Sequence, residues 1–405
     1  MNQSTKIKKV PKLRFREFVD GWTLVMLGGI ADFFKGKDIS KADITDGGVN
    51  ECIRYGELYT RYAEVIKEVY SKTNLDSKSL MLSKYNDVII PASGETNVDI
   101  ATASCVLKDD VALGGDINIM RTKHDGVFLS YYLNNLKKLE IAKLAQGNSV
   151  VHIYPSQLKT LPLNMPDIKE QNKIAEFLSA AEAKIAALWR KKELLEKYKK
   201  ATMAAVFSQK NNFKDKNGND YPRWQKKTLG DIGAIITGKT PSTSNADLWG
   251  GDVLFITPTD IDNNIKYQDT AARTVSSVAQ AKILPAKSIL YTCIASIGKM
   301  SLSTKPSITN QQINALVPFE ASNNEYVYYA LLWITPYIKA TRATTTLPII
   351  NKTEFAKFNI PFPSYPEQQK IADFLTSIDD KINLTKRELG QAKTFKRVLL
   401  QQMFI

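Results

Sequence analysis

Eight residues near the middle of the chain carry glycine, lysine and threonine at the spacing of a phosphate-binding loop. The stretch GAIITGKT, from Gly233 to Thr240, fits the pattern G-x-x-x-x-G-K-[ST], whose backbone N–H groups and lysine hold nucleotide phosphates. Such a loop joins a buried strand to a helix, and the helix N-terminus faces the phosphate. Here Pro241 disfavours helical backbone at Thr240, and a run of Ser, Thr and Asn then favours a turn. The sequence therefore favours a basic loop that could touch DNA phosphates, with a P-loop nucleoside triphosphatase as the alternative.

The overall charge also indicates an anionic partner. The 405 residues include 55 Lys and Arg against 41 Asp and Glu, which gives a formal net charge of +14. An excess of this size is typical of proteins that bind nucleic acid. No apolar stretch approaches the roughly 20 residues of a membrane-spanning helix, so we expect no membrane contact.

Few residues could bind a metal or act as a nucleophile. Cys52, Cys105 and Cys293 are scattered and form no C-x-x-C pair, which argues against a disulfide framework or a thiolate zinc site. Free thiols of this kind fit a reduced cytoplasmic compartment. The two histidines, His124 and His152, argue against His-rich metal sites and Ser-His-Asp catalysis. We therefore predict no metal and no catalytic residue.

The chain contains an internal repeat. PDIKEQNKIAEFLSAAEAKI (166–185) aligns with PSYPEQQKIADFLTSIDDKI (363–382) at an offset of 197, with ten of twenty positions identical. A weaker match at an offset of 202 aligns Trp22 with Trp224. In this alignment Ala31 and Asp38 replace the first glycine and the last threonine of GAIITGKT, so the first copy lacks the phosphate-cradle pattern.

The repeat predicts the domain organisation. We expect two similar mixed α/β domains of the α+β class, each followed by a long helix, related by a pseudo-two-fold internal repeat. The two helices are expected to be antiparallel and to form a coiled coil that separates the domains. The predicted segments are domain 1 over 11–165, a central helix over 166–207, a linker over 208–220, domain 2 over 221–363 and a C-terminal helix over 364–405.

The two long helices carry apolar stripes. Apolar residues recur at spacings of four and three, which is the pattern of a coiled-coil seam. At 1.5 Å per residue each helix would be ~60 Å long, and an isolated helix would leave its stripe in water. We expect the stripes to face each other; the alternative is that each helix packs on its own domain. The apolar tip RVLLQQMFI is expected to pack near Pro11–Trp22. The stripe residues are Ile174, Leu178, Ala181, Ile185, Leu188 and Leu195 in the first helix and Ile371, Leu375, Ile378, Ile382, Leu389 and Leu399 in the second.

Several motifs resemble one known family. EQNKIAEFL, PEQQKIADFL, ITGKTPS, LWGGDVLFITPTDI, YTCIASIGKM and ITNQQINAL look like the specificity subunits of type I restriction-modification systems, over nearly the whole chain. The first globular segment departs more, with FFKGKDISKAD where the second has IITGKTPSTSN. The same motifs would fit a related type IIB-like system with other partners.

The resemblance implies function and partners. It implies a non-catalytic subunit that binds a bipartite asymmetric double-stranded DNA target, one half per domain. The paired helices would set the spacing and dock two methylase subunits, which in turn bind the restriction motor subunits. S-adenosylmethionine, ATP and magnesium would belong to those partners, and none to this chain.

The predicted DNA contacts combine cations, hydroxyls and amides. Cations and hydroxyls can anchor phosphates, and Asn or Gln can pair bidentately with adenine. The same amides could instead cap turns, and the tyrosine could belong to the core. The second domain offers Lys239, Thr240, Ser242, Lys299, Asn310, Gln311, Gln312, Arg342, Thr344, Thr345 and Thr346, and the repeat alignment adds Lys37, Ser40, Arg54, Tyr55, Asn97 and Asn118 in the first.

Overall fold

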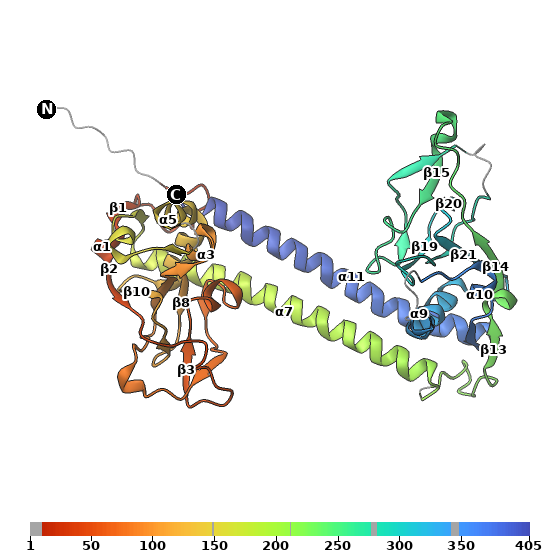
Figure 1. The fold of residues 1–405 in the computed structure, drawn as a ribbon, viewed down its shortest axis with the longest axis horizontal. Coiled ribbons are helices and arrows are strands. Elements are labelled where there is room, and N and C mark those ends of the chain that lie inside the picture. Colours follow the sequence, from red (N-terminus) through yellow and green to blue (C-terminus); the bar gives the residue numbers. More distant parts are fainter. Residues whose placement is uncertain (1–9, 148–149, 211, 277–281, 342–347) are drawn as a thin grey trace. The chain divides into compact units, whose positions relative to one another are not determined.

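The structure is a computed structural model that describes residues 10–147, 150–210, 212–276, 282–341 and 348–405. The chain divides into two compact units, one of residues 1–189 with 388–405 and one of residues 190–387. Each unit holds a globular domain and one part of each long helix, α7 (Ile168–Phe207) and α11 (Tyr365–Gln402) (Figure 1).

The first unit is built on a five-stranded sheet of order β2-β10-β6-β8-β4 and a three-stranded sheet of order β5-β3-β9. Two short pairs, β1–β12 and β7–β11, complete it. The strands are β1 (Thr23–Met26), β2 (Ala31–Lys35), β3 (Asn50–Ile53), β4 (Val65–Ile66), β5 (Ser71–Thr73), β6 (Asp87–Pro91), β7 (Ser93–Gly94), β8 (Ser104–Val106), β9 (Ala112–Leu113), β10 (Ile117–Thr122), β11 (Val151–His152) and β12 (Pro162–Met165). The helical elements are α1 (Leu27–Ile30), α2 (Glu57–Thr60), η1 (Ser77–Ser79), α3 (Asn97–Ile100), α4 (Gly126–Tyr132), η2 (Leu133–Lys137), α5 (Lys138–Leu144) and α6 (Pro155–Leu158).

The second unit repeats this topology. Its five-stranded sheet has the order β14-β21-β18-β19-β16, its three-stranded sheet the order β17-β15-β20, and β13 pairs with β22. The strands are β13 (Gln225–Thr228), β14 (Gly233–Thr237), β15 (Trp249–Ile256), β16 (Tyr267–Gln268), β17 (Arg273–Val275), β18 (Ile289–Thr292), β19 (Met300–Ser303), β20 (Ser307–Thr309), β21 (Ile313–Pro318) and β22 (Asn359–Phe362). The helical elements are α8 (Leu229–Ile232), η3 (Ala246–Leu248), α9 (Asn324–Ala340) and α10 (Lys352–Ala356). Two similar mixed α/β domains, as the repeat predicts, are therefore confirmed.

Each five-stranded sheet is covered on both faces. In β6, Val88 and Ile90 join the core formed with α4, while Ile89 joins the core shared with the three-stranded sheet. The same alternation places Tyr291 and Leu290 of β18 in two different cores. Strands buried on both faces read as continuous apolar runs, as these do.

The long helices pack on a globular domain and on each other at the same time. In the first unit Ile174 and Leu178 of α7 share a core with Leu399 of α11 and the domain. In the second unit Ile378 and Ile382 of α11 share a core with α7 and the domain. The apolar stripes therefore face each other and also pack on a globular domain, so both expected arrangements occur together. Among the described residues, no helix is long and apolar enough to cross a membrane.

Ion pairs show the direction of the helices within the second unit. Glu196 pairs with Lys386 and, one turn later, Lys199 pairs with Asp379, so the partner number falls as the α7 number rises. The helix segments are antiparallel there. The stripe is less complete in the first unit, where Ala181 and Leu188 line a groove of about 620 Å³ beside α11. The other stripe residues are buried at Ile185, Ile371, Leu375 and Leu389 and half-buried at Leu195.

The end of α11 fills the core of the first domain. The ring of Phe404 meets Trp22 edge-on at a centroid distance of 6.4 Å and lies 5.3 Å from the ring of Phe128. The hydroxyl of Tyr132 donates to the carbonyl of Ile405 at 2.7 Å. The expected packing of the apolar tip near Pro11–Trp22 is confirmed.

The Glu-Gln pair of the repeated signature is buried at the start of each helix. The Gln171 amide donates to the carbonyl of Pro166 at 2.8 Å, and its counterpart Gln368 donates to Pro363 at 2.9 Å. Glu170 accepts two hydrogen bonds of 2.7 Å from Arg14. These polar residues fix the chain where the domain continues into the helix, and they lie away from solvent.

Candidate nucleic-acid interface

The stretch that resembles a phosphate-binding loop is a sheet strand. Residues Gly233–Thr237 form β14, which pairs antiparallel with β21, and the helix α8 precedes the strand. The next helical element after Thr240 is the single turn η3. A Cβ on Gly238 would lie 2.2 Å from the carbonyl oxygen of Asn310, so close backbone packing explains this glycine. Residues 238–245 contain no helix and η3 begins only at Ala246, so the structure does not favour the nucleoside triphosphatase alternative.

The β14–β21 pairing brings several predicted contact residues together. Thr237 is opposite Asn314, so the loop after β14 lies beside the turn that precedes β21. The hydroxyl of Thr240 donates to the side-chain oxygen of Gln311 at 2.9 Å. Lys239 and Gln311 are exposed. A cation and an amide therefore reach solvent side by side at one end of the sheet.

Other predicted residues at this end are engaged locally. The Asn310 amide donates to the side-chain oxygen of Gln312 at 3.0 Å, and the Gln312 backbone N–H donates back to Asn310 at 3.1 Å. The Lys299 ammonium donates to the carbonyl of Pro258 at 3.0 Å. The exposed Ser242 exchanges a hydrogen bond of 2.8 Å with the hydroxyl of Ser244. Arg342, Thr344, Thr345 and Thr346 lie outside the described residues.

The loop after β15 belongs to the same place, which sequence reasoning missed. Asn310 donates its backbone N–H to the carbonyl of Ile256, the last residue of β15, at 3.3 Å. This contact brings Thr257 and the exposed Thr259 next to the amide turn. We call residues 238–242, 257–259 and 310–312 the strand-end cluster of the second unit.

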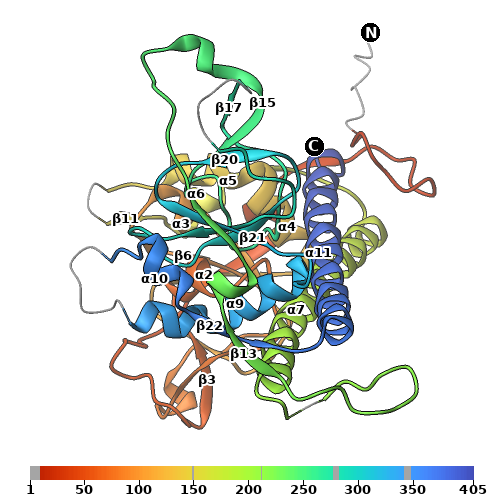
Figure 2. The ribbon, with the colours of Figure 1, turned by 90° about the vertical axis from the view of Figure 1, so that its right-hand side faces the viewer.

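A cation–π pair on the projecting β15–β17 ribbon was also missed. The Arg273 guanidinium lies 3.5 Å from the centroid of the Trp249 ring, and Arg273 is exposed. Figure 2 shows these strands extending away from the rest of the second unit. The tryptophan stands in a quoted motif, but nothing local in the sequence pairs it with an arginine 24 positions later.

The first unit has an equivalent strand-end cluster of residues 36–38, 54 and 114–116. Lys37 donates its backbone N–H to Leu113 at 2.8 Å, and Gly114 donates to Ile53 at 2.9 Å. A Cβ on Gly36 would lie 1.8 Å from the carbonyl oxygen of Gly114, so glycine is required. Where the second unit presents Asn310, Gln311 and Gln312, this unit presents Gly114, Gly115 and Asp116.

Arg54 is the principal cation of the first cluster. It lines a depression of about 700 Å³ in which the cations Arg61 and Lys72 lie with the carboxylates Asp46 and Glu57. Its Nε is buried and finds no hydrogen-bond acceptor among the described residues.

Asn118 is a structural residue, and its assignment as a DNA contact is corrected. Its side chain is fully buried, and its amide donates to the carbonyl of Ile153 at 3.0 Å. The counterpart Asn314 donates to the carbonyl of Ile350 at 3.1 Å. A buried amide that satisfies a backbone carbonyl in both copies cannot reach a base edge.

The remaining predicted residues of the first unit are exposed but dispersed. Ser40 donates to the Asp43 carboxylate at 2.6 Å, which lowers the pKa of that carboxyl. Tyr55 is 37% exposed and follows Arg54 directly, while the exposed Asn97 opens the short helix α3. The structure therefore groups Lys37 with Arg54 and leaves Ser40, Tyr55 and Asn97 outside the defined cluster.

The family comparison follows the same division of the chain. Residues 19–197 and 222–394 each match a family model described as a type I restriction modification DNA specificity domain. The chain belongs to this family. Both matched stretches contain one globular domain and the start of the helix that follows it, so the specificity-domain repeat and the structural repeat coincide.

Individual relatives of this specificity-domain family match parts of the chain. It is 40% identical over 148 residues to the type I restriction enzyme HindI specificity subunit of Haemophilus influenzae, covering 35% of this chain and 32% of that protein. It is 33% identical over 207 residues to the MjaIX specificity subunit of Methanocaldococcus jannaschii, covering 49% of this chain and 48% of that protein. The chain thus matches about a third and about half of the lengths of these two relatives.

A solved structure shares the fold over nearly the full chain. The S subunit of a type I restriction-modification system from M. genitalium superposes with a TM-score of 0.65 at 19% identity, covering 98% of this chain and 99% of that one. The similarity at this identity concerns the fold, which includes both domains and both long helices.

Proposed function

We propose that this chain is the DNA-recognition subunit of a type I restriction-modification system, in which each globular domain reads one half of a bipartite target. The supporting observation is that two domains of one topology present strand-end clusters with different side chains. The second cluster offers amides at 310–312, where the first offers two glycines and Asp116. Different readers on equivalent scaffolds imply an asymmetric target.

The two clusters divide recognition between phosphates and bases. Lys37, Arg54 and Lys239 would anchor phosphates, because their cations lie at or beside solvent at the strand ends. Gln311 would read a base, since an exposed carboxamide can donate to adenine N7 and accept from its N6 amino group. The Thr240 hydroxyl orients that carboxamide. Recognition of this kind requires no catalytic group from this chain.

The proposed organisation has a domain over 11–165 and another over 221–363, joined by helices over 166–207 and 364–405 with a linker over 208–220. The helix pair would set the spacing between half-sites and dock two methylase subunits. The restriction motor subunits would join through the methylases. S-adenosylmethionine, ATP and magnesium would be bound by those partners.

The deciding experiment is co-expression of the chain with the methylase of its own system, followed by genome-wide mapping of methylated adenines. We expect one bipartite motif with two different halves and a fixed gap. Omission of this chain from the co-expression serves as the control. Methylation that is absent, unchanged without the chain or confined to one uninterrupted motif would contradict the proposal.

A further inference from the structure

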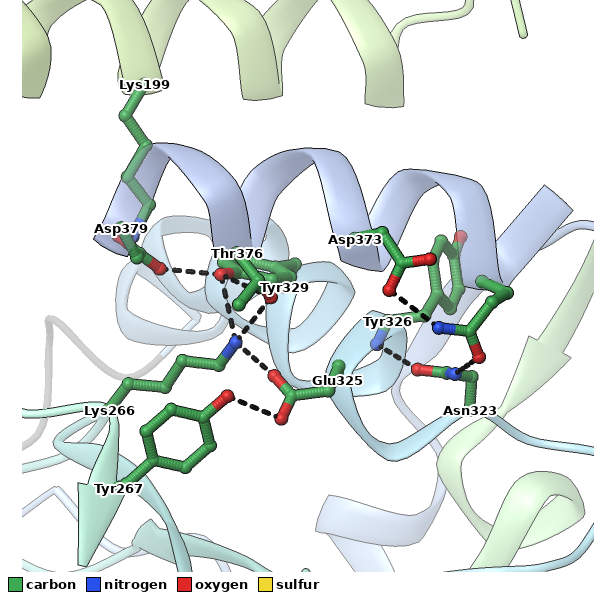
Figure 3. Close-up of polar contacts among 11 residues, drawn as sticks. Lys199, Lys266, Tyr267, Asn323, Glu325, Tyr326, Tyr329, Asp373, Thr376 and Asp379 are labelled. Carbon is green, nitrogen blue, oxygen red and sulfur yellow. Dashed lines mark hydrogen bonds and ion pairs between the residues drawn. The ribbon is translucent and has the colours of Figure 1, made fainter. Parts of the chain in front are cut away.

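A charged triad joins three elements inside the second unit. The Lys199 ammonium of α7 lies 2.6 Å from one carboxylate oxygen of Asp379 on α11. The other oxygen of Asp379 accepts a hydrogen bond of 2.6 Å from the hydroxyl of Tyr329 on α9 (Figure 3). Lys199 also lies 5.4 Å from the centroid of the Tyr329 ring. Both long helices and the domain are thereby held at one point.

A second cation connects this point to the sheet. Lys266 directly precedes the edge strand β16, is only 7% exposed and forms an ion pair with Glu325. Its ammonium donates to the Tyr329 hydroxyl at 3.0 Å and to Thr376 of α11 at 2.9 Å (Figure 3). Burial lowers the pKa of Lys266, and the hydrogen bond and charge of Glu325 oppose that shift. The sheet edge is therefore fastened to α11 through a buried ammonium.

The first unit contains the corresponding lysine, carboxylate and tyrosine at the offset of the repeat, but the buried hydroxyl of Tyr131 makes no hydrogen bond among the described residues, so the tyrosine contact is through its ring alone. Lys396 of α11 lies 2.5 Å from the carboxylate of Glu182 on α7 and 5.2 Å from the centroid of the Tyr131 ring on α4. Lys396 and Glu182 stand 197 positions from Lys199 and Asp379, and Tyr131 stands 198 positions from Tyr329. The roles of the helices are exchanged, because the lysine now comes from α11 and the carboxylate from α7.

The residue that directly precedes the edge strand of the five-stranded sheet is acidic in the first unit and basic in the second. Glu64 directly precedes the edge strand β4, as Lys266 precedes β16, and it lies 3.4 Å from the Lys396 ammonium. The acid can bind the helix lysine directly. In the second unit the corresponding residue, Lys266, is itself a cation and forms its ion pair with Glu325.

We propose that the triads Lys199–Asp379–Tyr329 and Lys396–Glu182–Tyr131 are positioning residues that set the angle at which each recognition domain meets its half-site. This inference rests on the proposed function. In both units the residue before the edge strand of the five-stranded sheet contacts the triad: Lys266, before β16, donates to Tyr329, and Glu64, before β4, pairs with Lys396. The opposite edge strand, β14 or β2, leads into the strand-end cluster. Four strand spacings make a lever of ~19 Å, so a tilt of about 10° moves the reading edge by roughly 3 Å. That displacement equals the length of a hydrogen bond.

The test compares Lys199→Met and Lys396→Met with Lys200→Met and Lys393→Met in the complete methylase complex. The control lysines are exposed neighbours on the same helices, so each variant loses one positive charge. Methylation rates are measured on duplexes with the native gap and with gaps one base pair longer or shorter. We expect the triad variants to lose about tenfold of their discrimination against the altered gaps, because a misplaced reader no longer favours one geometry. The control variants Lys200→Met and Lys393→Met should keep their discrimination against the altered gaps.

An equal loss of methylation rate on all three duplexes would overturn the proposal, since it would indicate weaker binding without a change of geometry. Asp379→Asn keeps the volume of the side chain and provides a milder variant if Lys199→Met fails to fold. Amide hydrogen exchange without DNA gives an independent readout: α9 and β16 should exchange faster in Lys199→Met than in Lys200→Met. Unchanged exchange would also reject the positioning role. Absence of a bipartite motif for the unmodified chain would instead reject the proposed function.

Discussion

The hydroxyl of Thr240 donates a hydrogen bond to the side-chain oxygen of Gln311, which comes from a turn 71 residues later in the chain. The contact exists because β14 and β21 are adjacent strands of one sheet. It holds the Gln311 carboxamide in one orientation while leaving the residue exposed. An amide that is oriented before binding loses less conformational entropy when it meets a base.

Replacing this amide should affect one half of the target. We expect Gln311→Ala to weaken methylation of the cognate motif by about 1–3 kcal/mol and to relax the base preference at one position of one half-site. The measurement is the methylation rate on duplexes with single base changes in each half. Asn359→Ala removes an exposed amide elsewhere in the second unit and serves as the control. Equal relaxation in both halves would argue against independent readers.

Removing a phosphate anchor should act on every sequence alike. For Lys239→Ala we expect weaker binding to specific and random DNA, and a salt slope reduced by about one. Lys226→Ala, which deletes an exposed lysine on β13, should leave the slope unchanged. The measurement is the binding constant over a series of salt concentrations. A loss confined to the cognate sequence would assign Lys239 to base reading instead.

The two buried asparagines should matter for stability and not for base preference. Asn118→Ala removes the donor to the Ile153 carbonyl, and Asn314→Ala does the same for Ile350. Leaving a buried carbonyl unpaired costs about 1–3 kcal/mol, which urea denaturation would detect in each variant. A stable Asn118→Ala variant with altered base preference would restore the interpretation of this residue as a reader.

Replacing the two glutamates of the repeated signature, Glu367 and Glu170, by glutamine should change the thermal stability in opposite directions. Burial raises the pKa of Glu367, so its charged form is less favourable in the folded chain than in the unfolded chain. Stability is therefore lost as the pH rises from the unfolded pKa through the folded pKa, and Glu367→Gln should raise Tm at pH 7. The difference should close near pH 4.

Glu170 provides the matched comparison. Its carboxylate binds Arg14 through two hydrogen bonds, so Glu170→Gln should lower Tm at neutral pH by leaving a partly buried guanidinium without its partner. The measurement is thermal unfolding from pH 4 to pH 8 for both variants. Destabilisation by Glu367→Gln at pH 7 would show that the hydrogen bond from Trp224, which opposes the rise in pKa, outweighs the burial of the carboxylate.

Phe404, two residues beyond the end of α11, should contribute more to the free energy of unfolding than Phe395, an exposed aromatic residue on that helix. Phe404→Ala leaves a cavity between Trp22 and Phe128, and we expect a loss of about 3–5 kcal/mol. Phe395, which is 51% exposed, should cost about 1 kcal/mol or less when replaced by alanine. Denaturation followed by tryptophan fluorescence would compare them. Similar losses for both variants would mean that the Trp22 pocket contributes little.

The repeat and the helices could be predicted from the sequence because both are expressed in residue spacing. Ten identities at one offset predict two similar domains, and the apolar spacing of four and three predicts the helices. The sheets bring together residues far apart in the chain, as when Cys52 of β3 pairs with Ala112 of β9. Spacing carries no signal for such pairing.

The site was harder to predict because residue type does not reveal burial. Asn118 and Gln311 are both amides near the start of corresponding strands, yet one lies in the core and the other in solvent. Asn118 and Asn314 occupy the same place in β10 and β21, and each donates to a carbonyl 35 or 36 positions later. Only the structure identifies those carbonyls as partners.

The insertion of Phe404 beside Trp22 also orders events during synthesis. Residues 11–165 leave the ribosome first, but part of their hydrophobic core comes from Leu399, Met403 and Phe404. The domain that is translated first must wait, incompletely packed, for residues made about 240 positions later, at rates of roughly 5–20 residues per second. Nascent chains therefore spend many seconds with an open aromatic pocket, and chaperone demand should be greatest for the domain that emerges earliest.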